Sequence, residues 1–154
     1  MEYLVVKWVH VISSTLLFGT GIGSAFYLLV ASWRRDPATA YFVARHVVIA
    51  DWLFTATSIV VQPVTGLWLV HIAGMPLSSR WLTWSIVLYA IAAACWLPVV
   101  WLQMRLRDLA RDAAAAKQPL PPLYWKHFRQ WFALGVPAFF ALLAVFYLMV
   151  AKLA

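Results

Sequence analysis

His10 is the residue of this sequence whose chemistry is most at odds with its surroundings. It stands beside Val9, Val11 and Ile12 in a long apolar segment, where an imidazole without a hydrogen-bond partner is costly. Ionisable side chains in such segments usually face the interior of a bundle and bind a ligand or carry protons. We therefore predict that His10 faces inward and has a functional role.

His71 is the candidate partner of His10. At about 1.5 Å per residue, His10 lies roughly 11 Å and His71 roughly 16 Å from the midplanes of their segments, toward the same side. Because the two segments are predicted to be antiparallel neighbours, the two imidazoles are expected to approach one site. Met149, in the last apolar segment, is predicted at a depth close to that of His10.

His46 and His127 form a second candidate pair, because both fall roughly 20 Å from the midplanes toward the other side. Their neighbours Arg45, Lys126 and Arg129 are basic. Such histidines often lie at the membrane interface beside lipid phosphates, and this explanation is favoured over a binding site.

Asp51 is the acidic residue that falls inside an apolar segment, one turn from Arg45 and His46. A buried carboxylate needs a partner. An ion pair with Arg45, or with a basic residue of the last helix, is the structural explanation, and a proton path is the functional one.

The first apolar segment has two faces of small or polar residues. One carries His10, Ser13 or Ser14, Leu17, Gly21 and Ser24, and the small residues Ser14 and Gly21 leave room for a bulky planar ligand beside His10. The adjacent face carries Thr15, Gly19 and Gly23, a spacing typical of close helix packing.

Three prolines, Pro63, Pro98 and Pro137, fall inside three different apolar segments. Proline removes a helical hydrogen bond. We expect the freed carbonyl groups and the resulting kinks to open a cavity between the helices.

The composition requires a membrane. Of 154 residues 65% are hydrophobic and only 11% are charged, which excludes a soluble globular core. The net charge of +7 comes from residues between the apolar segments, so it is interpreted as a topology signal, and nucleic acid is not an expected partner.

Four segments are long enough to cross a hydrocarbon layer of about 30 Å. We predict helices over about residues 4–31, 47–73, 81–117 and 127–152, the third including a cytoplasmic extension. The fold class is therefore an all-α membrane protein, a four-transmembrane-helix bundle forming a single domain over residues 1–154.

The basic residues are distributed unevenly between the two ends of these helices. One end carries Arg34, Arg35, Arg45, Arg105, Arg107, Arg111, Lys117, Lys126 and Arg129, and the other carries Lys7, Arg80 and Lys152. The positive-inside rule then places the first and third loops in the cytoplasm and both termini outside.

Several short motifs resemble known families. The start Val6-Lys7-Trp8-Val9-His10, the Gly66-Leu67-Trp68-Leu69 motif, and Phe128-Arg129 followed by Pro137 and Val150-Ala151-Lys152 resemble HemJ-type proteins, which are haem b-binding protoporphyrinogen oxidases. The K-x-x-H start is also similar to the membrane domain of CopD copper-resistance proteins. Nearly the whole chain resembles the uncharacterised bacterial DUF2269 family. The segments that carry this resemblance are His10–Thr15 and Gly19–Gly23.

These resemblances imply a multi-pass protein of the bacterial inner membrane that binds haem b, with His10 as one axial ligand and His71 or Met149 as the other. The resemblance itself extends to His10 alone, and His71 and Met149 are candidates for the second ligand from their predicted depths. The substrate would be a membrane-accessible molecule such as a quinol or a porphyrinogen, in electron transfer or oxidation. The CopD resemblance implies metal-ion transport or handling at His10 and His71. A non-catalytic subunit that binds another membrane protein, or a homo-oligomer, is the third alternative.

Overall fold

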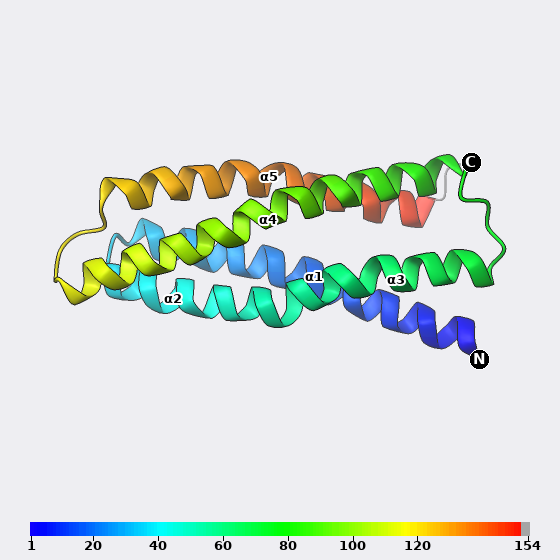
Figure 1. Cartoon of the computed structure of the whole chain (residues 1–154), viewed down its shortest axis with the longest axis horizontal. Coiled ribbons are helices and arrows are strands. Elements are labelled where there is room, and N and C mark those ends of the chain that lie inside the picture. The colour runs from blue at the N-terminus through cyan, green and yellow to red at the C-terminus, as the bar shows by residue number, and fades with distance from the viewer. Residues whose placement is uncertain (152–154) are drawn as a thin grey trace.

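The computed structural model describes residues 1–151, and every element among them is a helix. The helices are α1 (Glu2–Trp33), α2 (Pro37–Ala50), the π-helical turn η1 (Asp51–Thr55), α3 (Ala56–Ile72), α4 (Arg80–Ala115) and α5 (Pro122–Ala151). Because α2, η1 and α3 follow one another without a break, the chain forms four rods that lie side by side (Figure 1). The predicted all-α bundle is confirmed.

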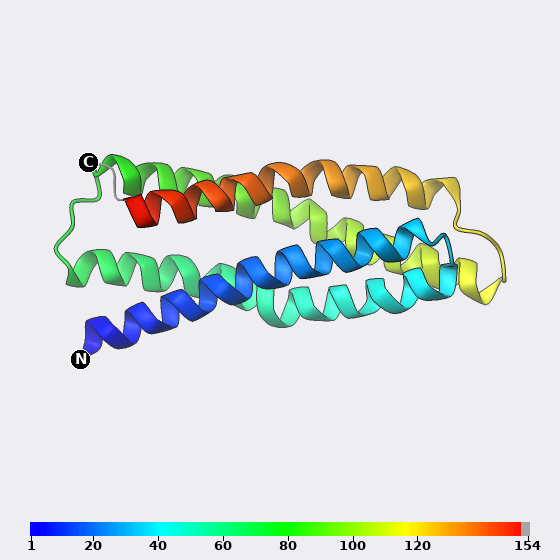
Figure 2. The ribbon, with the colours of Figure 1, turned by 180° about the vertical axis from the view of Figure 1, so that it is seen from behind.

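Each of the four rods is long and apolar enough to cross a membrane. The chain turns back after each rod, so α1 begins and α5 ends at the same end of the bundle (Figure 2). We call this the terminal end, and the end with the α1–α2 and α4–α5 connections the opposite end. Large apolar side chains, including Trp8, Phe26 and Phe140, are exposed around the rods, as contact with lipid requires.

The second rod begins at Pro37, whereas the apolar pattern predicted its start at about residue 47. Its cap explains the earlier start. The Asp36 carboxylate accepts hydrogen bonds from the Thr39 amide at 2.8 Å and from the Thr39 hydroxyl, and Pro37 occupies the first helical position, where its missing N–H costs nothing. These bonds from Thr39 hold the pKa of Asp36 below its ordinary value. Hydropathy alone marks the membrane part of a helix and misses such a polar first turn.

The fourth rod likewise begins at Pro122, before the predicted residue 127, and Lys152 lies outside the described residues. The third rod extends to Ala115, close to the predicted end of its extension. At the opposite end these extensions pack tightly around Tyr124, which is fully buried together with Leu28 and Leu106. Ser32 donates to Leu28 O at 2.7 Å, so the Tyr124 hydroxyl donates to Ser32 Oγ, also at 2.7 Å.

The terminal half is more loosely assembled. There α1 packs on α3 and α4 packs on α5, while α1 and α5 make few contacts. One link between the two pairs follows directly from Pro63, which cannot donate to Ile59 O. The Tyr89 hydroxyl of α4 donates to Ile59 O at 2.8 Å instead. The predicted effect of a helical proline, a freed carbonyl group, is confirmed here.

Candidate site: a cavity in the middle of the bundle

A cavity of about 390 Å³ lies between α1, η1–α3, α4 and α5. Its walls are mostly apolar and aromatic, and they include Leu17, Phe18, Trp131 and Phe139. Mostly apolar cavities of this size with a few polar groups are typical binding sites for small molecules. Trp131 is buried, 4% exposed, and its side chain forms part of the wall.

Asp51 supplies the one carboxyl group in the cavity wall. It is 3% exposed and accepts a hydrogen bond from the Thr55 hydroxyl at 2.8 Å. Both residues belong to the π-helical turn η1. A π-helical turn interrupts the regular bonding of the helix and is frequent at functional sites. The turn thus places an acid and a hydroxyl together at the wall.

The predicted ion pair of Asp51 is wrong. Among the described residues, the ion pairs join arginine and aspartate side chains near the end of α4, and none includes Asp51. Arg45 is exposed. Arg45 and Asp51 are six residues apart, so they lie on different faces of the helix. The neighbour of Asp51 across the bundle is Gln103 of α4, whose amide group faces the carboxyl.

Two polar atoms of α4 are buried without a partner in the described part of the chain, Gln103 Oε1 and Trp96 Nε1. Both side chains line the cavity. They are seven residues apart, which places them on one helix face about 10.5 Å apart along the axis. An unpartnered buried acceptor and donor usually indicate a missing ligand or water. The cavity therefore offers one free acceptor and one free donor besides Asp51.

The cavity opens sideways between α1 and α5. Gly21, Ile22, Val136 and Phe140 line it and are also exposed, on two helices that contact each other little. A Cβ atom added at Gly21 would meet no atom within 4 Å. In a bilayer this opening faces the acyl chains, so a lipophilic molecule can enter from the membrane.

His10 lies in the contact between α1 and α3. Thr65 donates its hydroxyl proton to Val61 O at 2.7 Å, so Thr65 Oγ1 accepts from His10 Nδ1–H at 2.8 Å. This bond assigns the proton to Nδ1 and leaves the lone pair on Nε2. The Gln62 amide also donates to His10 O at 2.9 Å. The prediction that His10 faces a helix of the bundle is consistent with these contacts.

A family model described as "Predicted integral membrane protein (DUF2269)" matches residues 4–153. The chain belongs to this family. No curated protein and no solved structure matches it. The resemblance to HemJ-type and CopD proteins therefore stays a prediction.

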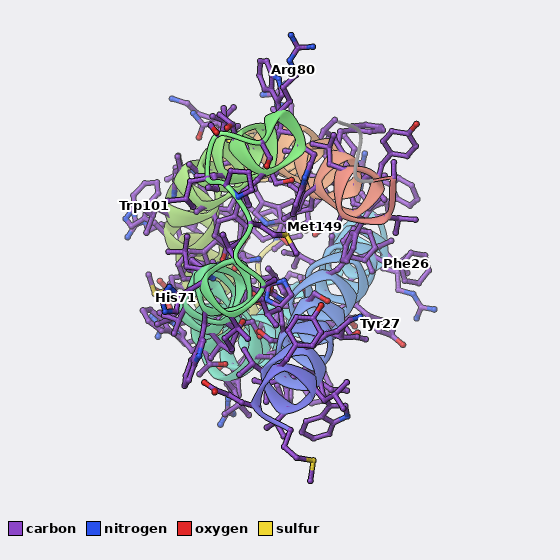
Figure 3. All side chains as sticks on the ribbon, turned by 90° about the vertical axis from the view of Figure 1, so that its right-hand side faces the viewer. Phe26, Tyr27, His71, Arg80, Trp101 and Met149 are labelled. Carbon is purple, nitrogen blue, oxygen red and sulfur yellow. The ribbon has the colours of Figure 1, made fainter. Side chains whose placement is uncertain are left out.

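The structure of this DUF2269 protein does not bring His10 and His71 to one site. His71 lies on the outer side of α3 and points away from the bundle, whereas Met149 points toward the middle (Figure 3). Among residues 1–151, no group of three or more His, Cys, Asp or Glu side chains is placed to hold a metal ion. Gly66 of α3 lies against His10. His71 is five positions further along α3 and therefore lies on a different side of that helix. The structure thus gives no support to a bis-histidine site.

His46 and His127 each bond within their own helix. His46 Nδ1–H donates to Phe42 O at 2.7 Å, and His127 Nδ1–H donates to Gln130 Oε1 at 3.2 Å. His46 is exposed and His127 is half-buried against Trp101. Arg129 is exposed as well. This arrangement agrees with the interfacial explanation that the sequence favoured.

The small residues of α1 do not form the two faces that the sequence predicted, one beside a ligand and one against another helix. Leu17, Gly21 and Ser24 line the cavity, while Ser14 bonds to its own backbone at Val11 O, 2.7 Å away. Gly19 and Gly23 were expected to pack against a helix, but a Cβ atom added at either would meet no atom within 4 Å. Packing of that face against a second protein or a second copy stays a prediction.

Sequence reasoning missed Gln103, Trp96 and Tyr89 as site residues of this family member. Gln103 carried a usable signal, because it stands in an apolar run before the first arginine of the extension. Trp96 and Tyr89 carried none, since aromatic side chains are frequent throughout the chain.

Proposed function

We propose that this membrane protein binds a lipophilic molecule with a hydrogen-bonding ring, of the quinol class, in the central cavity. The observation that supports this most is the pairing of a lipid-facing opening with polar atoms that have no partner, Gln103 Oε1 and Trp96 Nε1. An unpaired buried polar group costs about 1–3 kcal/mol. A ligand that bonds to both atoms removes this cost.

The polar groups of the cavity match the two hydroxyl groups of a quinol. Each hydroxyl both donates and accepts a hydrogen bond. Gln103 Oε1 and the Asp51 carboxyl can accept from the ring hydroxyls, and Trp96 Nε1–H can donate to one of them. The flat ring suits walls formed by Phe18, Trp131 and other aromatic side chains.

An isoprenoid tail fits the opening between α1 and α5. The residues at the opening are apolar or glycine, and outside it lie the acyl chains of the bilayer. A tail leaving by this route stays in an apolar medium throughout, so only the ring has to enter the protein. A porphyrinogen carries several carboxylates, for which the cavity wall offers no basic side chain among residues 1–151. The quinol class is therefore favoured over porphyrinogens.

The test compares two glycines of α1. Gly21→Leu fills the opening, whereas Gly19→Leu adds the same side chain at an exposed position that is not part of the cavity wall. Quenching of tryptophan fluorescence by a short-chain ubiquinol analogue measures binding. We expect Gly21→Leu to raise the Kd at least about tenfold, equivalent to about 1.4 kcal/mol, and Gly19→Leu to leave it unchanged.

Equal Kd values for both variants would contradict the proposal. A competition experiment provides a second test of whether the head-group bonds contribute to binding. If decane or phospholipid tails displace the analogue as well as a second quinol does, the cavity is a lipid site and the head-group bonds contribute nothing.

Haem b at His10 is the second candidate, and one observation favours it. A histidine that binds a metal through Nε2 usually donates Nδ1–H to a neighbour, as His10 does to Thr65. However, His10 is not part of the wall of the central cavity, and Met149 is the one partner of the sequence prediction that points inward. Visible absorption of the purified protein decides: a haem spectrum lost in His10→Ala supports this candidate, and a colourless protein removes it.

We also propose that the terminal end faces the outside of the bacterial inner membrane. The support is the excess of arginine and lysine near the opposite end, nine residues against three. Reporter fusions at the C-terminus and within residues 112–118 should give opposite locations, the C-terminal one outside. A cytoplasmic C-terminal reporter would reverse the orientation.

A further inference from the structure

The side of η1 and α3 that faces the bundle is almost entirely polar. Its buried residues are Asp51, Thr55, Ser58, Gln62, Thr65 and Val70, so five of the six carry a polar side chain. We call Asp51, Thr55, Ser58, Gln62 and Thr65 the polar row. Residues of a membrane helix that are buried against other helices do not need polar side chains for solubility. Each polar side chain buried there costs free energy.

The spacing of the polar row makes it continuous. Its members follow one another by four, three, four and three residues, which keeps them on one helix face with neighbouring Cβ atoms about 5–6 Å apart. Protein bonds already join the two ends: Thr55 to Asp51 at 2.8 Å, and Thr65 to His10 at 2.8 Å. A single water molecule bonded to two neighbours covers the spacing between the others.

The helices opposite the row add further polar atoms. Ser13 of α1, one turn from His10, is 6% exposed, and its Oγ has no partner within the described residues. Gln103 Oε1 of α4 is unpartnered beside Asp51. These orphaned atoms, one on α1 and one on α4, are sites where bound water is expected. At Asp51 and Thr55 the row also borders the central cavity, which has room for water.

Close packing of small residues is the competing explanation for serine and threonine in membrane helices. It does not account for Asp51 or Gln62, which are neither small nor cheap to bury. Nor does it account for Ser13, whose hydroxyl group could have bonded to its own backbone as those of Ser14 and Thr15 do.

We propose that the polar row is a proton route, through which Asp51 exchanges its proton with water at the terminal end, with His10 as the titratable group of the route nearest that end. A proton added to His10 Nε2 allows Nδ1–H to pass to Thr65, and the hydroxyl and water molecules pass one proton each toward the Asp51 carboxylate. Each transfer breaks one N–H or O–H bond and forms one, so no oxidant or reductant is needed. When Asp51 releases its proton the transfers run in reverse, so Nδ1 regains a proton from Thr65 and Nε2 loses one to water, which restores His10.

Few titratable groups face this route. From α4 the Tyr89 hydroxyl lies near it, bonded to Ile59 O, and from α1 Lys7 lies one turn beyond His10 and is exposed. His71 points away from the bundle (Figure 3). Asp51 and His10 are therefore the two titratable groups at the ends of the route. It goes beyond the proposed binding of a quinol and does not depend on it.

The experiment follows the Asp51 carboxyl group directly by infrared difference spectroscopy in vesicles, without any quinol. An affinity tag on the N-terminus selects vesicles whose terminal end faces the external buffer. The carboxyl band that disappears in Asp51→Asn reports its protonation. We expect this band to follow a jump in external pH and to ignore a jump in internal pH.

Interrupting the route should slow that response. We expect Thr65→Val and Ser58→Ala to slow it at least tenfold, whereas Thr57→Val, on the exposed side of the same helix, leaves the rate unchanged. A band that follows the internal pH, a band that follows neither, or equal rates in all variants would overturn the proposal. Ser58→Ala, which removes only a hydroxyl group, keeps the test valid if Thr65→Val folds poorly.

Discussion

Tyr124→Ala is expected to destabilise the bundle more than any other single substitution considered for this chain, by about 3–5 kcal/mol. Tyr124 of α5 is fully buried at the opposite end, in a core that includes residues of α1, α2 and α4. Arg35 lies over the ring of the adjacent residue Trp125, and α4 carries the Arg111–Asp108 ion pair near its end. This end of the bundle is therefore in contact with water, and the hydrophobic effect acts on its core. Removing the ring leaves a cavity that the surrounding helices cannot fill.

The measurement uses Cys95, the one cysteine of the chain. Its reaction with a thiol-specific dye during heating reports unfolding in detergent. Tyr124→Phe is the matched variant, because it keeps the ring and loses only the bond to Ser32, for which we expect about 1 kcal/mol. Tyr27→Ala, at an exposed aromatic residue, should have almost no effect. Equal melting temperatures for Tyr124→Ala and Tyr27→Ala would show that this core does not hold the rods together.

The helices and their order follow from the sequence because the membrane imposes them. Backbone groups in hydrocarbon must be bonded within a helix, so an apolar segment of sufficient length determines a span without reference to its neighbours. The polar turns at Asp36 and Pro122 escaped this reasoning, since they lie outside the apolar part. Each was visible as a capping or first-turn proline signal.

The site could be predicted only in part, because its parts come from different helices. The space beside Gly21 followed from residue size and spacing on α1 alone. That Asp51 rather than His10 lies at this space depends on how α1 and η1 are rotated against each other, which no spacing within one helix determines. The partner of Asp51 was misjudged for the same reason: Arg45 is near in sequence, but Gln103 of α4 is near in space.

Gly66→Leu is expected to destabilise the terminal half by about 1–3 kcal/mol, the usual cost of overpacking. A Cβ atom at Gly66 would lie 3.2 Å from His10 Cε1, so the glycine is what allows the imidazole to lie against α3. The larger leucine side chain must push α1 away. Both bonds between the helices at this point, His10 to Thr65 and Gln62 to His10 O, are then lost.

A double substitution separates this clash from a general effect of leucine at position 66. In Gly66→Leu/His10→Ala the imidazole is gone, so the added side chain finds space. The loss of stability should then be smaller than the sum of the two single losses by at least about 0.5 kcal/mol, the lower bound for residues in contact. Gly19→Leu, where no atom lies within 4 Å, should combine additively with His10→Ala. Additive losses for both pairs would mean that His10 does not lie against Gly66, and the bond to Thr65 that assigns its proton to Nδ1 would lose its support.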